Sequence, residues 1–110
     1  MHELGITRSI VAIVTEHSGG QKVVRVTVEL GRLCGFAPDA LRFCFDLCAH
    51  GTLADGAQLD IVEIDGLGRC SACGAQNRLE IPMGYCPSCG RPALTIVAGE
   101  ELKIREMEVL

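Results

Sequence analysis

Aromatic residues are scarce in this chain of 110 residues, where they make up 4% and tryptophan is absent. A core without large rings has to be built from aliphatic side chains, and hydrophobic residues do reach 48% of the chain. That share predicts a folded protein, because disordered chains are poor in such residues. The length suits one compact unit with a small appended module.

An excess of basic charge is also missing, since the formal net charge is −4. Binding to nucleic acid depends on clustered lysine and arginine, so we expect no nucleic-acid partner. No segment approaches the roughly 20 apolar residues of a membrane helix. The run "IVAIV" near the start is too short for a secretory signal, and Glu3 and Arg8 interrupt its flank. We therefore expect a cytoplasmic protein without a membrane partner.

Two segments show the periodicity of amphipathic helices. The first runs from about Glu3 to His17, where isoleucines recur at spacings of four and three. The second follows Pro38 and carries an apolar face at positions i, i+3, i+4 and i+7, with Gly51 as a plausible cap. That face consists of Leu41, Cys44, Phe45 and Cys48.

Three segments read as strands. Residues 24–30 alternate strictly between apolar and polar, and residues 58–64 form a second apolar run. Residues 101–110 make a third strand, in which the alternation slips and predicts a bulge near Arg105–Glu106. This last strand should return to the first sheet. Between the strands, residues 67–98 are dominated by Gly, Cys and Pro.

These patterns predict an α+β fold. It would consist of a small three-stranded sheet flanked by two helices, with an inserted Cys₄ zinc-ribbon-like module. The predicted domains are residues 1–66 plus 99–110 for the α+β part and residues 67–98 for the module.

The most specific motif is a repeated Cys-x-x-Cys-Gly. It occurs as "CSACG" and "CPSCG", whose four cysteines are Cys70, Cys73, Cys86 and Cys89. Each pair directs two sulfurs at one point, and two such knuckles on adjacent hairpins complete a tetrahedral cage that suits zinc. The 12 residues between the pairs would supply the outgoing and returning arms of a hairpin. Four thiolates leave no open position for catalysis, so the predicted role is structural.

Two other readings of the cysteine pairs stay open. The knuckles also look like those of rubredoxin, which would make the chain an iron electron carrier, although such a site is packed in aromatic residues. Disulfides are the weaker reading in a reducing compartment. The other three cysteines, Cys34, Cys44 and Cys48, are predicted to be packed thiols. His17 and His50 are predicted to interact with a helix end or with solvent.

The chain opens with Met1-His2-Glu3, which could bind a metal through nitrogen atoms. The α-amine of Met1, the amide nitrogen of His2 and its imidazole can close fused chelate rings nearly in one plane. The amide or carboxylate of Glu3 could supply a fourth donor. Planar nitrogen ligation is what Ni(II) and Cu(II) prefer. Because such a site lies at an accessible end of the chain, its metal is labile and can be passed to another protein. That property is typical of a carrier.

The chain as a whole resembles the HypA/HybF family of nickel-insertion metallochaperones. The resemblance rests on "MHELGITRSI", "GRLCGFAPDALRFCFD", "GTLADGAQLDI" and the paired cysteines, in that order along the chain. It implies that His2 binds nickel transiently, that Glu3 assists, and that Cys70, Cys73, Cys86 and Cys89 hold structural zinc.

The resemblance also implies the partners. They would be the GTPase HypB and the precursor of the [NiFe]-hydrogenase large subunit, with urease maturation proteins added because some family members serve urease. It implies hydrogenase maturation rather than enzymatic catalysis, by a monomer or a weak homodimer. The alternative functions are a zinc-ribbon adaptor for nucleic acid or protein, and the iron electron carrier.

Overall fold

The computed structural model describes the backbone of residues 2–110 and the side chains of residues 4–110, which form two compact units. The first unit holds the described residues through Val28, together with Phe36–Val62 and Lys103–Leu110. The second holds Glu29–Gly35 and Glu63–Leu102. The elements along the chain are α1 (His2–His17), β1 (Val23–Gly31), α2 (Pro38–Ala49), β2 (Gln58–Ile64), β3 (Gly66–Cys70), β4 (Gln76–Leu79), β5 (Leu94–Ala98) and β6 (Leu102–Val109).

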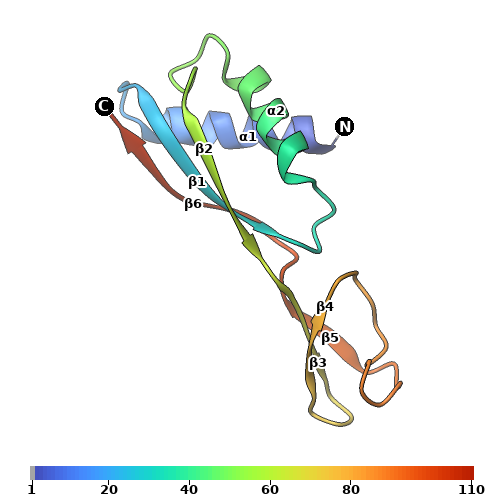
Figure 1. Cartoon of the computed structure of the whole chain (residues 1–110). Coiled ribbons are helices and arrows are strands. Elements are labelled where there is room, and N and C mark those ends of the chain that lie inside the picture. The colour runs from blue at the N-terminus through green and yellow to red at the C-terminus, as the bar shows by residue number, and fades with distance from the viewer. Residues whose placement is uncertain (1) are drawn as a thin grey trace. The chain divides into compact units, whose positions relative to one another are not determined.

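The strands form two sheets of three, and Figure 1 shows both. One sheet has the order β2-β1-β6 and the other the order β4-β3-β5. The predicted α+β class is confirmed, with two helices and a three-stranded sheet to which the final strand β6 returns. Of the described residues, no helix combines the length and the apolar character that a membrane crossing needs.

The core of the first unit is aliphatic, as the scarcity of aromatics predicts. In β1 the side chains of Val23, Val26, Val28 and Leu30 are buried. The strict alternation expected from the sequence is not kept, because Val24 is only half-buried and Thr27 is buried. Helices α1 and α2 pack against each other. In α2 the side chains of Leu41 and Phe45 are fully buried, while Cys44 and Cys48 are half-buried at the margins of that face. The predicted apolar face of this helix is therefore in the right position, but its two cysteines are less buried than Leu41 and Phe45.

The sheet of the second unit is built around β3. This strand pairs antiparallel with β4 on one side and with β5 on the other. The predicted hairpin between the two cysteine pairs is wrong in one respect: its outgoing arm forms β4, but residues 80–85 form no returning strand. Pro82, which has no backbone N–H, and Gly84 both disfavour a strand there. The neighbour of β3 on its other side is instead the later segment β5.

The turn after β1 packs closely within the second unit. The amide of Leu33 donates to the carbonyl of Gly99 at 2.8 Å, and that of Arg32 donates to Ile64 at 2.9 Å. These hydrogen bonds attach residues 29–35 to the segment from Glu63 onward. The predicted domain limits, with residues 67–98 as a separately folding module, stay a prediction.

Candidate metal centre

The first cysteine knuckle follows directly from the end of β3. The amide of Cys70 donates to the carbonyl of Ala75 at 2.9 Å, and the amide of Gly74 donates back to the carbonyl of Cys70 at 2.9 Å. Gly74 has a φ of +76°, which a residue with a side chain adopts at a cost. Inside this turn the amides of Ala72 and Cys73 point at the Cys70 Sγ, at 3.3 and 3.4 Å.

The second knuckle repeats this geometry. The amide of Cys86 donates to the carbonyl of Arg91 at 2.9 Å, and the amide of Gly90 donates to the carbonyl of Cys86 at 2.8 Å. Gly90 also has a φ of +76°. The amide of Ser88 lies 3.3 Å from the Cys86 Sγ. The same five-residue sequence pattern thus folds twice into the same turn, as the spacing predicts.

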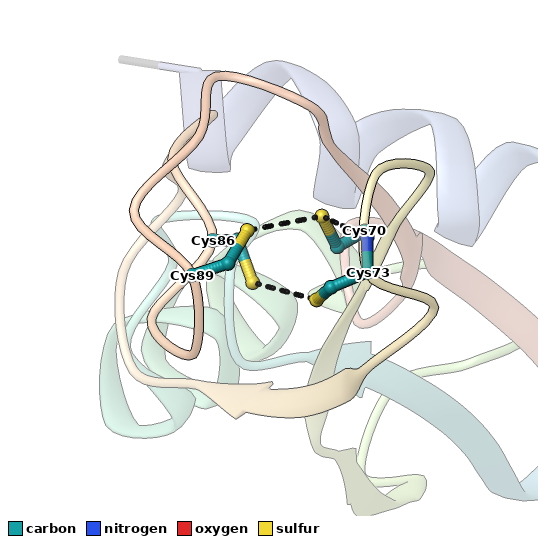
Figure 2. Close-up of side chains that lie close together, drawn as sticks. All are labelled: Cys70, Cys73, Cys86 and Cys89. Atoms are coloured by element: carbon teal, nitrogen blue, oxygen red, sulfur yellow. Dashed lines mark hydrogen bonds between the residues drawn. The ribbon is translucent and has the colours of Figure 1, made fainter.

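The two knuckles face each other and bring the four sulfurs together (Figure 2). The Cys70 and Cys89 sulfurs are 3.7 Å apart, and so are the Cys73 and Cys86 sulfurs. All four ligand atoms lie within 4.8 Å of one another. Each close contact is between a cysteine of one knuckle and a cysteine of the other, so the cluster brings together two segments that are 13–19 residues apart in sequence.

This geometry fits a tetrahedral zinc site. A Zn–S distance of about 2.3 Å places the sulfurs of a regular tetrahedron about 3.8 Å apart, close to the observed contacts. A disulfide needs an S–S distance of about 2.05 Å, and all seven cysteines are free. The disulfide reading is therefore wrong for this structure. Four thiolates in a tetrahedron suit both zinc and iron.

The electrostatics of the cluster favour thiolates at the two buried positions. The amide of Cys89, and then that of Ser88, lower the pKa of Cys86 to about 6 despite the opposing effect of burial. The amide of Cys73 likewise lowers the pKa of Cys70. For Cys73 the Ala75 amide acts in the same direction, but burial and the neighbouring thiols together raise its pKa to about 11. A bound cation would be needed to hold all four sulfurs as thiolates near neutral pH.

Residues outside the cysteine pairs support the knuckles. The amide of Ser71 donates to the carbonyl of Ala93 at 3.0 Å, which ties the first knuckle to the start of β5. The hydroxyl of Ser88 donates to the Asn77 Oδ1 at 3.3 Å, which ties the second knuckle to β4. Sequence patterns did not single out Asn77, because a polar residue on a short strand has no distinctive spacing.

The predicted N-terminal nickel ligands are only partly within the structure. Met1 lies outside the described residues, and so do the side chains of His2 and Glu3. The backbone of α1 begins at His2. The arrangement of nitrogen donors at this end therefore stays a prediction.

The remaining cysteines and histidines take no part in the four-sulfur cluster. The Cys48 Sγ lies 3.4 Å from the Thr7 Oγ1 and 3.8 Å from the carbonyl of Leu4, so it contributes to the packing of α2 on α1. His17 Nδ1 is 2.8 Å from the carbonyl of Ile13 in the preceding turn. His50 is 87% exposed and lies 3.8 Å from Asp55. Among residues 4–110, no other group of three metal-ligating side chains converges.

A family model described as "Hydrogenase/urease nickel incorporation, metallochaperone, hypA" matches residues 1–109. The chain belongs to the HypA family. Its relatives include the hydrogenase maturation factor HypA of Nostoc punctiforme, which is 56% identical over 109 residues, covering 99% of this chain and 96% of the relative. The HypA of Geobacter metallireducens is 43% identical and covers 99% of both chains. The resemblance stated from the sequence is confirmed.

Solved structures of HypA proteins share the fold. One, described as the solution structure of HypA protein, has a TM-score of 0.72 at 26% identity and covers 100% of this chain and 97% of its own. The solution structure of the Ni metallochaperone HypA from Helicobacter pylori has a TM-score of 0.71 at 24% identity, covering 98% and 97%. The HypA architecture thus spans both units of this chain.

Proposed function

We propose that this chain captures Ni(II) at its N-terminus and delivers it for insertion into the large subunit of a [NiFe]-hydrogenase. The observation that carries the proposal is the match to the nickel-incorporation family over residues 1–109, which includes the Met1-His2-Glu3 opening. Metal transfer makes and breaks no bond of a substrate molecule, so the chain acts as a carrier and not as an enzyme.

The start of α1 is suited to nitrogen ligation. Because the helix begins at His2, the amide of His2 is among the first four N–H groups, which have no acceptor within the helix. A metal can therefore replace this proton without breaking a helical hydrogen bond. With the amine of Met1 and the imidazole of His2, it gives three nitrogen donors, and Glu3 adds an amide or a carboxylate. Ni(II) prefers such a planar set.

The four cysteines serve a structural purpose in this proposal. We assign zinc to Cys70, Cys73, Cys86 and Cys89, since the two separations of 3.7 Å between the knuckles match the edge of a zinc–thiolate tetrahedron and four thiolates fill the coordination sphere. The aromatic packing of a rubredoxin site is lacking: the chain contains a single tyrosine, three phenylalanines and no tryptophan. Colourless purified protein with one zinc per chain would exclude the iron reading, whereas red protein would support it.

The proposed partners follow from family membership. The GTPase HypB would accept the loaded chain or share its nickel, and the hydrogenase large-subunit precursor would receive the metal. Urease maturation proteins are the alternative clients, because the family description names both hydrogenase and urease. The net charge of −4 opposes the alternative of a nucleic-acid adaptor.

Calorimetric titration with Ni(II) tests the N-terminal site. The native chain, His2→Ala and a chain with one additional N-terminal residue are compared, each loaded with zinc. The extension keeps every side chain and only moves the amine out of the chelate, so both altered chains should lose high-affinity binding. His50→Ala is the matched control, because this exposed histidine lies outside the proposed site. Equal nickel binding by the native, His2→Ala and extended chains would refute the N-terminal site.

A further inference from the structure

One buried polar atom in the second unit has no hydrogen-bond partner. Among the side chains of residues 4–110, the carboxamide nitrogen of Asn77, Nδ2, is the only buried nitrogen or oxygen atom that no hydrogen bond satisfies. The oxygen of the same group, Oδ1, accepts from the hydroxyl of Ser88 at 3.3 Å. Native proteins seldom leave a buried N–H group unpaired, because its loss of hydration is costly. The unpaired Nδ2 therefore points to an acceptor close to Asn77.

The strand register places Asn77 on the face of its sheet that carries the first cysteine of the cluster. Asn77 of β4 lies opposite Gly68 of β3, and opposed residues of an antiparallel pair share a face. Cys70 follows Gly68 by two positions, so its side chain lies on that face as well. Asn77 and Cys70 are therefore diagonal neighbours, a separation that longer side chains can bridge.

The other side chains on this face are apolar. A Cβ at Gly68 would lie 2.9 Å from the side chain of Leu94 and 3.0 Å from that of Leu79, so both leucines cover the strand there. Leucine side chains accept no hydrogen bond, and the hydroxyl of Ser88 is already engaged with Oδ1. Among the side chains placed around Asn77, the acceptors that remain are the cysteine sulfurs.

Metal-bound thiolates benefit from such donors. Four thiolates around a divalent cation keep a net negative charge, and N–H groups of the surrounding protein offset it. The knuckles supply backbone amides for this purpose: those of Ala72 and Cys73 point at the Cys70 Sγ, and that of Ser88 points at the Cys86 Sγ. These three donors belong to the knuckles themselves. A side chain on β4 would add a donor from the supporting sheet.

We infer that the carboxamide of Asn77 donates its unpaired N–H to a thiolate of the zinc-loaded cluster and thereby strengthens metal binding. The inference rests on the zinc assignment proposed above. Loss of such an outer donor typically weakens metal binding by about 10–100-fold. Asn77 would act on the metal without being one of its ligands, which the spacing of cysteines cannot reveal.

Scalar coupling through the hydrogen bond tests the contact directly. The full-length chain is loaded with an NMR-active isotope of cadmium, a soft ion that replaces zinc at thiolate sites. Asn77 is the only asparagine of the chain, so its side-chain amide protons are easily assigned. They should couple to cadmium, as should the backbone amide proton of Ala72, the positive control. The side-chain amide of Gln76, whose oxygen accepts from Arg69, should show no coupling. Coupling at Ala72 without coupling at Asn77 would overturn the inference.

Competition with a chelator measures the effect on zinc affinity. Asn77→Asp keeps the oxygen that accepts from Ser88 but lacks the N–H group, and Asn77→Leu keeps the branched shape without a charge. Both variants should bind zinc at least about tenfold more weakly than the native chain. Circular dichroism verifies that each variant folds.

Ser88→Ala is the matched control. It removes the hydrogen bond to Oδ1 and leaves the N–H group of Asn77 in place, so the zinc affinity should fall far less. An equal loss in Ser88→Ala would show that Asn77 acts only by holding the second knuckle and would overturn the inference. Native affinity in both Asn77 variants would do the same. A native chain that binds no zinc would refute the zinc assignment as well.

Discussion

Four sulfur atoms and the amides around them account for the local chemistry of the second unit. Cys70 and Cys86 are the buried first members of their pairs, and each sulfur accepts hydrogen bonds from amides of its own turn. Cys73 and Cys89 are the exposed second members. This division gives each knuckle one thiol that is prepared to ionise and one that is accessible to an incoming metal.

The thiol of Cys86 is expected to ionise near pH 6 in reduced, zinc-free protein, provided that the knuckle stays folded. The cause is donation by the amides of Cys89 and Ser88, which lowers the folded-state pKa from 9.0 to about 6. This lowered pKa stabilises the folded unit fully above pH 9, and the effect is lost as the pH falls through 6. Thiolate absorbance in the ultraviolet should show the step, and Cys86→Ser should remove it. A titration with no thiolate below pH 8 would contradict this expectation.

Gly31 is expected to be intolerant of any side chain. A Cβ there would lie 2.2 Å from the carbonyl oxygen of Gly99, which itself accepts the amide of Leu33. Gly31→Ala should therefore lower the free energy of unfolding by about 1–3 kcal/mol, the usual cost of overpacking. Urea denaturation of the zinc-loaded chain measures it. Gly84→Ala is the control, since a Cβ at Gly84 meets no atom within 4 Å; equal effects would disprove the steric explanation.

At the scale of elements, α2 shows how one helix divides its two phenylalanines. Phe45 is fully buried among the aliphatic residues of the first unit, whereas Phe43 is 65% exposed. They lie two positions apart, so the helical repeat turns them to different sides. The periodicity of the sequence identifies Phe45 as a core residue and leaves Phe43 outside the apolar face.

Phe45→Ala is expected to destabilise the chain by about 3–5 kcal/mol, because it leaves a cavity where a large ring was buried. Phe43→Ala removes the same atoms from an exposed position of the same helix and should change the stability far less. The midpoints of thermal unfolding, followed by circular dichroism, compare the two variants directly. Similar losses of stability from both variants would show that Phe43 is covered in solution and would contradict its 65% exposure.

For the whole molecule, the two compact units predict a partial response to loss of metal. Both helices belong to the first unit, and all four clustered cysteines belong to the second. If zinc stabilises the second unit, chelation should unfold it and leave the helical circular dichroism largely intact. Hydrogen exchange should then accelerate at β3, β4 and β5 and stay slow in the buried parts of α1 and α2.

The matched control for chelation is Cys34→Ser. Cys34 lies in the second unit but outside the four-sulfur cluster, so the variant should keep its zinc and its exchange protection. Cys73→Ser should instead reproduce the effect of the chelator. Unchanged protection of β3 after complete removal of zinc would show that the second unit does not depend on the metal.

The sequence by itself determined the local elements and the four cysteines that converge in the second unit. Helices α1 and α2 and strands β1, β2 and β6 follow from the spacing of apolar residues, because a 3.6-residue or two-residue repeat fixes which side chains share a face. The cysteine knuckles are equally local, since each turn is closed by hydrogen bonds within six residues, such as Cys70 to Ala75. The same motifs also indicated the family to which the chain belongs.

Only the tertiary structure decided which distant segments meet. The pairing of β3 with β5, the attachment of residues 29–35 to the second unit and the open edge of β6 depend on long-range hydrogen bonds. Periodicity encodes the face that a strand buries but not the neighbour it pairs with.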